Sequence, residues 1–107
     1  MARLEPRDHT VSLNVAAAYT KRHRGTLKEK TGGAEHGGAF HADQVLKLLQ
    51  QPGCKALRIY HARNDKNEKA MILVAVDDTG KDMTQGMLLE QCWPCPPWCD
   101  PDSALVK

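Results

Sequence analysis

The sequence predicts an α+β domain in which two helices pack on a small two- or three-stranded antiparallel sheet, followed by a cysteine- and proline-rich C-terminal tail. Two segments have the apolar spacing of helices, and two later segments have the composition of strands and are separated by turn residues. A length of 107 residues suits a single domain that spans the chain. Hydrophobic residues make up 41% and charged residues 26%, as in ordinary globular proteins.

The first helix is expected from residue 12 to 24. Ser12 is a suitable N-cap, and Gly25 follows the last turn. Apolar residues recur at helical spacing at Val11, Val15, Ala18 and Tyr19. Residues 1–10 are expected to be flexible, and so are residues 25–39, which include Gly32, Gly33, Gly37 and Gly38.

A second helix is expected from about Ala42 to Gln51. Its apolar stripe consists of Val45, Leu48 and Leu49. The Pro52-Gly53 pair ends it, because proline cannot continue the helix and glycine tolerates the conformation after its last turn.

Two strands and their turns are expected next. Residues 56–62 alternate between apolar and polar, which predicts a strand with one buried face. Residues 70–76 are apolar throughout, as in a central strand covered on both faces. Residues 64–67 and 77–80 have turn composition. Met87-Leu88-Leu89 is expected to be a third strand or a short helix.

Charge and hydropathy narrow the possible partners. The formal charge is +2, and basic residues cluster only at Lys21, Arg22, Arg24, Lys28 and Lys30. Such charges suit a helix C-terminus, and no groove-reading motif accompanies them, so nucleic-acid binding is not expected. No stretch approaches the roughly 20 apolar residues that span a bilayer. The first nine residues lack the apolar run of a secretory signal, so a cytoplasmic location is expected if the chain starts at its natural N-terminus.

The C-terminal tail, residues 92–107, departs most from ordinary composition. Its segment 92–99 reads Cys-Trp-Pro-Cys-Pro-Pro-Trp-Cys. A reducing compartment favours metal or redox roles for such cysteines over structural disulfides. Cys92 and Cys95 have the spacing that lets two thiolates reach one zinc ion, with Cys99 as a third ligand and Cys54 as a fourth.

The ligand set remains open at this point. A histidine at position 36, 41 or 61 could replace one thiolate. An iron–sulfur cluster on the same thiolates is not excluded, although the spacing differs from that of ferredoxins. The prolines oppose a metal site, because they remove N–H donors and stiffen the loop toward an extended shape.

Two readings without a metal compete with zinc. A C-x2-C or C-x3-C dithiol could be a redox pair. Alternatively, Trp93, Trp98 and the prolines fold the tail back as a hydrophobic lid, with the cysteines as small apolar residues or with a disulfide to Cys54 as a staple.

Residues 38–99 resemble a group of small, uncharacterised bacterial proteins. The resemblance is carried by Gln51-Pro52-Gly53-Cys54, by the two strand segments Leu57–Tyr60 and Ile72–Asp77, and by Pro94-Cys95-Pro96-Pro97-Trp98-Cys99. It implies no activity. It does imply that Cys54, Cys95 and Cys99 belong together and that Cys92 is the extra cysteine.

The leading functional hypothesis is a small non-enzymatic binding or regulatory module whose tail is organised by a cysteine-ligated metal, most simply zinc. The alternatives are a thiol-redox protein that uses the tail cysteines, and a partner-binding domain with a disulfide or hydrophobic lid and no metal. Trp93 and Trp98 are the candidate anchors for a protein partner. Arg58 and Tyr60 could grip an acidic one. No catalytic signature is complete, so the sequence leaves open whether the protein is an enzyme.

Overall fold

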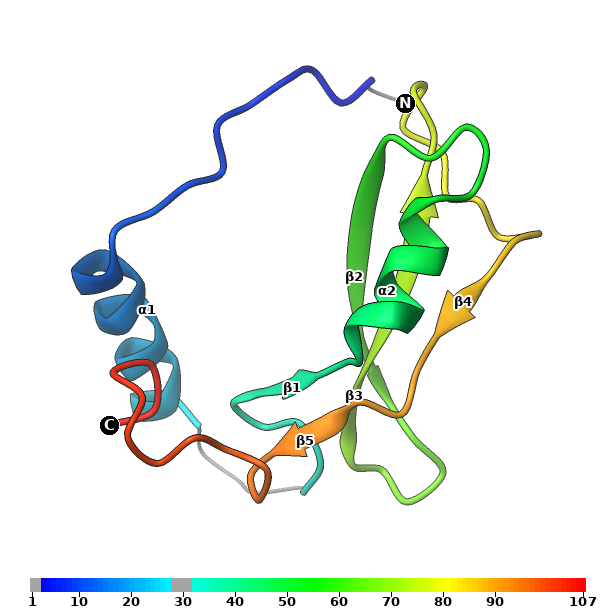
Figure 1. Ribbon diagram of the computed structural model, residues 1–107. Coiled ribbons are helices and arrows are strands. Elements are labelled where there is room, and N and C mark those ends of the chain that lie inside the picture. Colours follow the sequence, from blue (N-terminus) through cyan, green and yellow to red (C-terminus); the bar gives the residue numbers. More distant parts are fainter. Residues whose placement is uncertain (1–2, 28–31) are drawn as a thin grey trace.

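The structure, a computed structural model, describes residues 3–27 and 32–107 (Figure 1). It contains two helices and two antiparallel sheets, which confirms the predicted α+β class. The elements, in chain order, are α1 (Leu13–Gly25), β1 (Gly37–Ala39), α2 (Ala42–Leu49), β2 (Ala56–Arg63), β3 (Lys69–Val76), β4 (Leu88–Leu89) and β5 (Trp93–Cys95).

The larger sheet has the strand order β2-β3-β4 and confirms the predicted hairpin. Ala56 pairs with Val76 at one end of the hairpin, and Arg63 pairs with Lys69 at the other. Asn64 closes the connecting turn, where its side-chain oxygen accepts hydrogen bonds from the backbone N–H groups of Lys66 and Glu68. These local bonds are typical of asparagine in turns.

The hydrophobic core lies between α2 and the larger sheet. Leu48 of α2 is fully buried, as is Ala75 of β3, and Leu73 of β3 is 3% exposed. Seven partly buried apolar residues pack against these three: Phe40, Val45, Cys54, Met71, Met83, Met87 and Leu89. Val74 and Val76 are also buried. Neighbouring residues of β3 are thus covered on both faces, as predicted for a central strand.

Gln51 joins α2 to β4. Its side-chain oxygen accepts a hydrogen bond from the N–H of Met87 at 2.8 Å, and its side-chain nitrogen donates to the carbonyl of Leu48 at 2.7 Å. The segment predicted as a third strand or a short helix is therefore held as a strand, and Leu89 pairs with Leu73 of β3.

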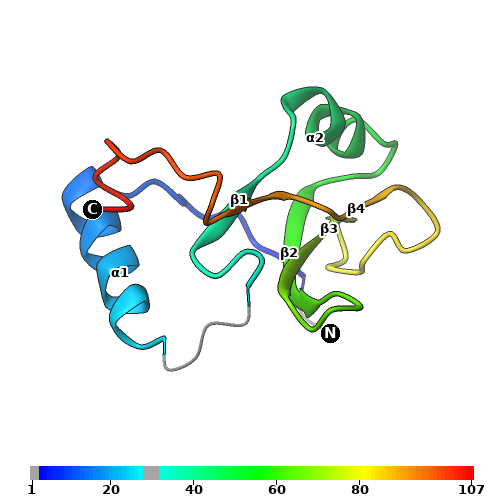
Figure 2. The ribbon, with the colours of Figure 1, turned by 90° about the horizontal axis from the view of Figure 1, so that it is seen from below.

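Helix α1 does not pack on the sheet. Its start is as predicted, with Ser12 as the N-cap and its hydroxyl accepting a hydrogen bond from the N–H of Val15. All of α1 lies within the described residues, and no residue of this helix is buried. Its middle is a run of three alanines, residues 16–18, so the predicted apolar stripe is narrow. Figures 1 and 2 show α1 at one side of the molecule and the larger sheet at the other.

Part of the segment expected to be a flexible loop is ordered by pairing. Strand β1 lies within it, and Gly33 forms a bridge to Lys69 of β3. Glu35 is 5% exposed, and its carboxylate accepts a hydrogen bond from the N–H of Gly32. Two residues of the predicted basic cluster, Lys28 and Lys30, lie outside the described residues.

Within residues 3–27 and 32–107, neither helix has the length and apolar character that a bilayer crossing requires.

Candidate interaction site

The smaller sheet brings two distant parts of the chain together. β1 and β5 are antiparallel, with Gly37 opposite Cys95 and Ala39 opposite Trp93. The N–H of His36 extends this pairing by donating to the carbonyl of Cys95 at 2.9 Å. The sequence did not reveal this pairing, because each strand has only three residues and β5 contains a proline.

A disulfide closes the turn that follows β5. Cys95 and Cys99 are bonded, and their Cα atoms are 4.8 Å apart. The N–H of Trp98 donates to the carbonyl of Pro94 at 2.8 Å, so the chain reverses its direction over a few residues. The proline-rich segment is therefore a closed turn and not the extended stretch expected from its composition.

The two tryptophans meet on this turn. The ring centroids of Trp93 and Trp98 are 5.1 Å apart, and the ring planes cross at 73°, which is the edge-to-face arrangement that aromatic pairs prefer. Trp93 is 48% and Trp98 61% exposed. The indole N–H of Trp93 donates to Nε2 of His41 at 3.3 Å. β1 and β5 are far apart in the chain, but for brevity we call this strand pair and the turn to Cys99 the Trp hairpin.

A glycine in β1 makes room for a thiol. A side chain on Gly38 would place its Cβ only 2.4 Å from Sγ of Cys92. Gly37, by contrast, has nothing within 4 Å of the position of an added Cβ. Cys92 is far from Gly38 along the chain but directly precedes β5, the strand that pairs with β1.

The predicted zinc-organised tail is wrong. Cys95 and Cys99 are joined in a disulfide, and no group of three or more His, Cys, Asp or Glu residues among those the structure describes could hold a metal ion. A C-x2-C pair reaches one ion only when the chain turns. Cys92 instead precedes an extended strand that contains Cys95, so the two side chains point to opposite faces.

Cys54 does not join the tail cysteines, contrary to what the resemblance implies. It packs against the core cluster, and its Sγ lies 3.5 Å from the carbonyl oxygen of Ala56. Cys54 and Cys92 are free thiols. An iron–sulfur cluster is typically held by four thiolates, twice the number that the disulfide leaves.

Cys92 does not have the environment of a nucleophile. Burial raises the pKa of the Cys92 thiol, and the nearby carboxylate of Glu90 raises it further. Catalytic thiols have a depressed pKa and lie in electropositive, accessible surroundings. The electrostatics around Cys92 therefore disfavour a thiol-redox enzyme that attacks through this residue.

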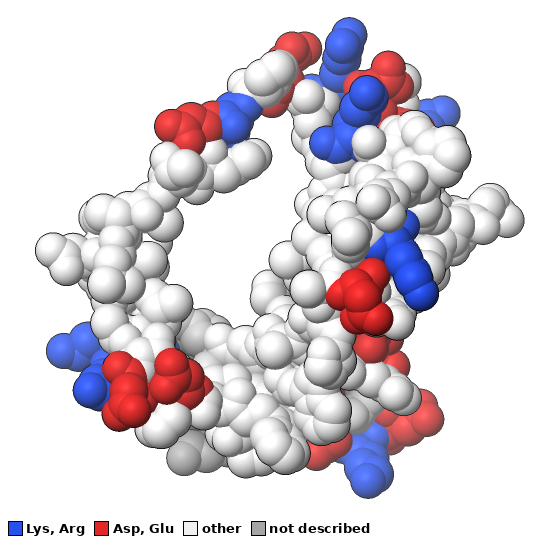
Figure 3. Space-filling view, in the orientation of Figure 1, with Lys and Arg blue, Asp and Glu red and all other residues white. Residues whose placement is uncertain are grey.

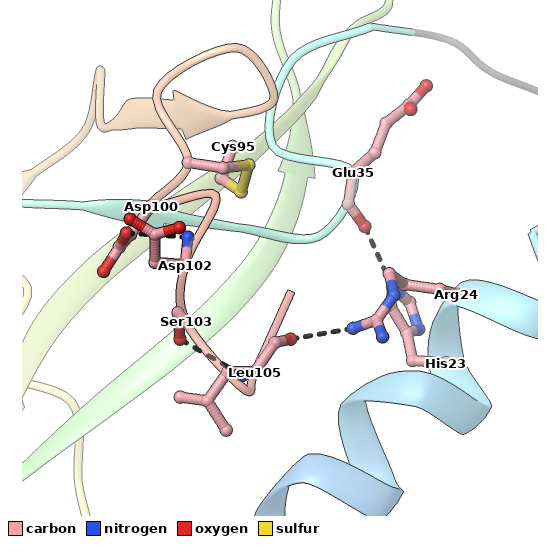
Figure 4. The surroundings of a disulfide bond; sticks show 9 residues. His23, Arg24, Glu35, Cys95, Asp100, Asp102, Ser103 and Leu105 are labelled. Atoms are coloured by element: carbon pink, nitrogen blue, oxygen red, sulfur yellow. Dashed lines mark hydrogen bonds between the residues drawn. A yellow bond between two sulfur atoms is a disulfide. The ribbon is translucent and has the colours of Figure 1, made fainter. Parts of the chain in front are cut away.

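The segment after the Trp hairpin lies against the end of α1 (Figure 4). The Arg24 guanidinium donates to the carbonyls of Leu105 and Lys107 at 2.7 and 2.6 Å. Nε2 of His23 lies within hydrogen-bond distance, 2.9 Å, of the carbonyl oxygen of Glu35. The side chains of His23 and Arg24, in the last turn of α1, are thus both used in contacts within the chain. Asp100 and Asp102 lie beside the disulfide in the same view.

Arg58 and Tyr60, predicted to contact a partner, have a partner within the fold. Nη1 of Arg58 donates to a carboxylate oxygen of Asp82 at 2.6 Å, and the hydroxyl of Tyr60 donates to the other oxygen. Arg58 and Asp82 have side chains that are 30% and 21% exposed. The two residues thereby tie β2 to the connection between β3 and β4. Binding of an outside partner by them stays a prediction.

Replacement of Asp82 by asparagine should remove a pH-dependent part of the stability. The hydrogen bond from Tyr60 and the neighbouring Arg58 guanidinium hold the pKa of Asp82 below its usual value, despite its partial desolvation. In acid, Asp82 therefore binds a proton more readily in the unfolded chain than in the folded one. Its contribution to the free energy of unfolding is fully present above about pH 4 and is lost as the pH falls through the folded pKa. The melting-temperature difference between wild type and Asp82→Asn should be constant near neutrality and shrink in acid.

Asp77→Asn is the matched control, because hydrogen bonds from Thr79 and Lys81 lower the pKa of Asp77 without involving β2. Its acid dependence should remain when Asp82 is replaced. An Asp82→Asn difference that stays constant down to the lowest pH would contradict this role for Asp82.

Comparison of the chain with protein-family models, with curated proteins and with solved structures gave no match. The resemblance to small bacterial proteins therefore stays a prediction, and the geometry of the Trp hairpin carries the functional proposal.

Proposed function

We propose that this protein is a non-enzymatic protein-binding domain and that the Trp hairpin is its recognition element. The observation that carries the proposal is the pair of exposed tryptophans held edge to face on a disulfide-closed turn. Tryptophan is among the residue types most enriched where binding energy concentrates in interfaces. A soluble domain gains nothing in its own stability from the half of each ring that faces water.

The hairpin is ordered before it binds, which favours affinity. The disulfide and three prolines restrict the conformations that the turn can adopt, and the hydrogen bond to His41 restrains the Trp93 ring. Association loses less conformational entropy when the contacting side chains are already restrained. Covering the exposed halves of both rings would remove roughly 250 Å² from water, which corresponds to about 6 kcal/mol before the costs of association.

The surroundings of the hairpin favour a partner segment that combines apolar and basic side chains. Asp100 and Asp102 follow the turn directly and lie beside the disulfide (Figure 4). Lysine or arginine of a partner could pair with these carboxylates and also stack on an indole face. Binding of such a segment should weaken as salt is added, because exposed charges are screened.

Trp98→Ala should abolish partner capture while leaving the fold intact. Trp98 is 61% exposed, so its removal costs the domain little beyond the aromatic pair, about 1 kcal/mol. The measurement compares the proteins retained from a cell extract by wild type and by this variant. Each captured protein is then purified and titrated directly, with tryptophan fluorescence as the readout.

Leu88→Ala is the matched control, because Leu88 is a comparably exposed apolar residue, 51%, on β4 of the other sheet. It should retain the same partners as wild type. Equal direct affinity of wild type and Trp98→Ala for every captured protein would overturn the proposal. Loss of the same partners from both Trp98→Ala and Leu88→Ala would overturn it as well.

A further inference from the structure

The isolated chain exposes more surface than a compact chain of its size. Its accessible surface is 8174 Å² for a mass of 11.9 kDa, and monomers of that mass expose about 5,900 Å². Its radius of gyration is 15.2 Å, whereas about 13 Å is typical of 107 residues. The excess of about 2,200 Å² per chain is comparable to what one subunit buries in a large homodimer interface.

The molecule encloses an opening that leaves the surface around it uncovered. Figure 3 shows it between α1 with the N-terminal segment on one side and the larger sheet with α2 on the other. Charged side chains lie mostly on the outer rim, and most of the surface around the opening is uncharged. A surface of this kind in a small domain is typical of one that another molecule covers.

β2 leaves two large apolar side chains uncovered on the face of the sheet that carries α2. Leu57 pairs with Ala75. Ile59 pairs with Leu73. Cross-strand partners share a face, so both side chains lie on the face that carries the core. However, α2 packs on β3 and β4, and Leu57 remains 37% and Ile59 52% exposed.

α1 carries complementary apolar side chains without a place to bury them. Leu13, Val15 and Tyr19 are 61%, 40% and 60% exposed. Val15 and Tyr19 are four residues apart and therefore share a helix face. A helix of 13 residues is about 20 Å long, and a strand of eight residues is about 26 Å long, so α1 can cover most of the length of β2.

The tail holds α1 away from its own sheet. Arg24 at the end of α1 binds the carbonyls of Leu105 and Lys107, and His23 contacts the carbonyl of Glu35. These contacts attach α1 to the segments around the Trp hairpin, on the far side of the opening from β2 (Figure 1). In this arrangement the helix that can reach β2 belongs to a second copy of the chain.

We propose that the protein forms a twofold symmetric dimer in which α1 of each copy packs on the exposed face of β2 of the other. A reciprocal contact of this kind uses the same two surfaces twice and closes on itself. Burial of even half of the excess surface of each chain would give an interface of about 2,200 Å² in total, within the range of stable homodimers. The dimer presents two Trp hairpins.

The test is the molar mass of the full chain, measured by light scattering during size-exclusion chromatography over a dilution series. Wild type should have twice the chain mass of 11.9 kDa. Ile59→Glu on β2 and Tyr19→Glu on α1 should each halve the measured mass, because each buries an unpaired carboxylate in the contact. Both substitutions are at exposed positions, and circular dichroism checks that each variant stays folded.

Leu88→Glu is the control, since Leu88 pairs with Val74 and so lies on the other face of the sheet. It should remain a dimer. A wild-type chain that is monomeric at every concentration would overturn the proposal. A dimer that survives either Ile59→Glu or Tyr19→Glu would overturn it as well, because the packing of α1 on β2 requires both surfaces.

Discussion

Cys95→Ser should lower the free energy of unfolding by about 2 kcal/mol and abolish the binding that depends on Trp98. The disulfide closes a loop from Cys95 to Cys99, and a loop this short restricts the unfolded chain by roughly that amount. The larger effect is on function. Without the bond the turn is free to open, and the two indole rings lose the arrangement that a partner would meet already formed.

Urea unfolding with and without a reducing agent measures the first effect, and the partner titration measures the second. Reduction should lower both the free energy of unfolding and the partner affinity of wild type, and it should leave both quantities unchanged in Cys95→Ser. Intact mass should increase by two hydrogens per chain when wild type is reduced under denaturing conditions. Cys92→Ser is the control, because Cys92 is a free thiol in the same segment and its replacement leaves the disulfide in place. Equal stability of wild type in both redox states would contradict the prediction.

Leu48→Ala should lower the free energy of unfolding by about 2 to 5 kcal/mol, the range found for fully buried leucines. Leu48 is 0% exposed and is the α2 residue at the centre of the core cluster. The effect is large for this protein, because few side chains in the described part of the chain besides Leu48 are fully buried and a domain of this size has a total stability of roughly 5 to 15 kcal/mol.

Leu46→Ala in the same helix separates burial from helix propensity. Leu46 is 54% exposed, so the same change of side chain there should have a much smaller effect, well under 1 kcal/mol. Urea denaturation followed by circular dichroism gives both values. Similar losses for the two variants would show that α2 is not held by the packing of Leu48.

The sequence by itself determined the elements whose causes are local. The alternation over residues 56–62, the apolar run over 70–76 and the turn residues between them predicted the hairpin of β2 and β3, because a strand period and a tight turn are set by neighbours in the chain. The start of α1 at Ser12 and the core position of Leu48 followed from capping and helical spacing in the same way.

Sequence reasoning also selected Trp93 and Trp98 as partner anchors, and the tertiary structure placed them side by side. It misjudged the cysteines around them. Spacing alone makes a C-x2-C pair compatible with a metal, a redox pair or an apolar role, and it cannot say which sulfurs meet. The choice of Cys95–Cys99 follows from β5, whose extended backbone turns Cys92 to the opposite face.

Only the tertiary structure decided which distant segments lie together. β1 pairs with β5 across more than half of the chain, and Asp82, between β3 and β4, accepts hydrogen bonds from Arg58 and Tyr60 of β2. It also decided that α1 is attached to the tail through Arg24 and leaves the apolar face of β2 open. Such contacts depend on the whole fold, because a three-residue strand or a single guanidinium carries too little local preference to specify a partner far along the chain.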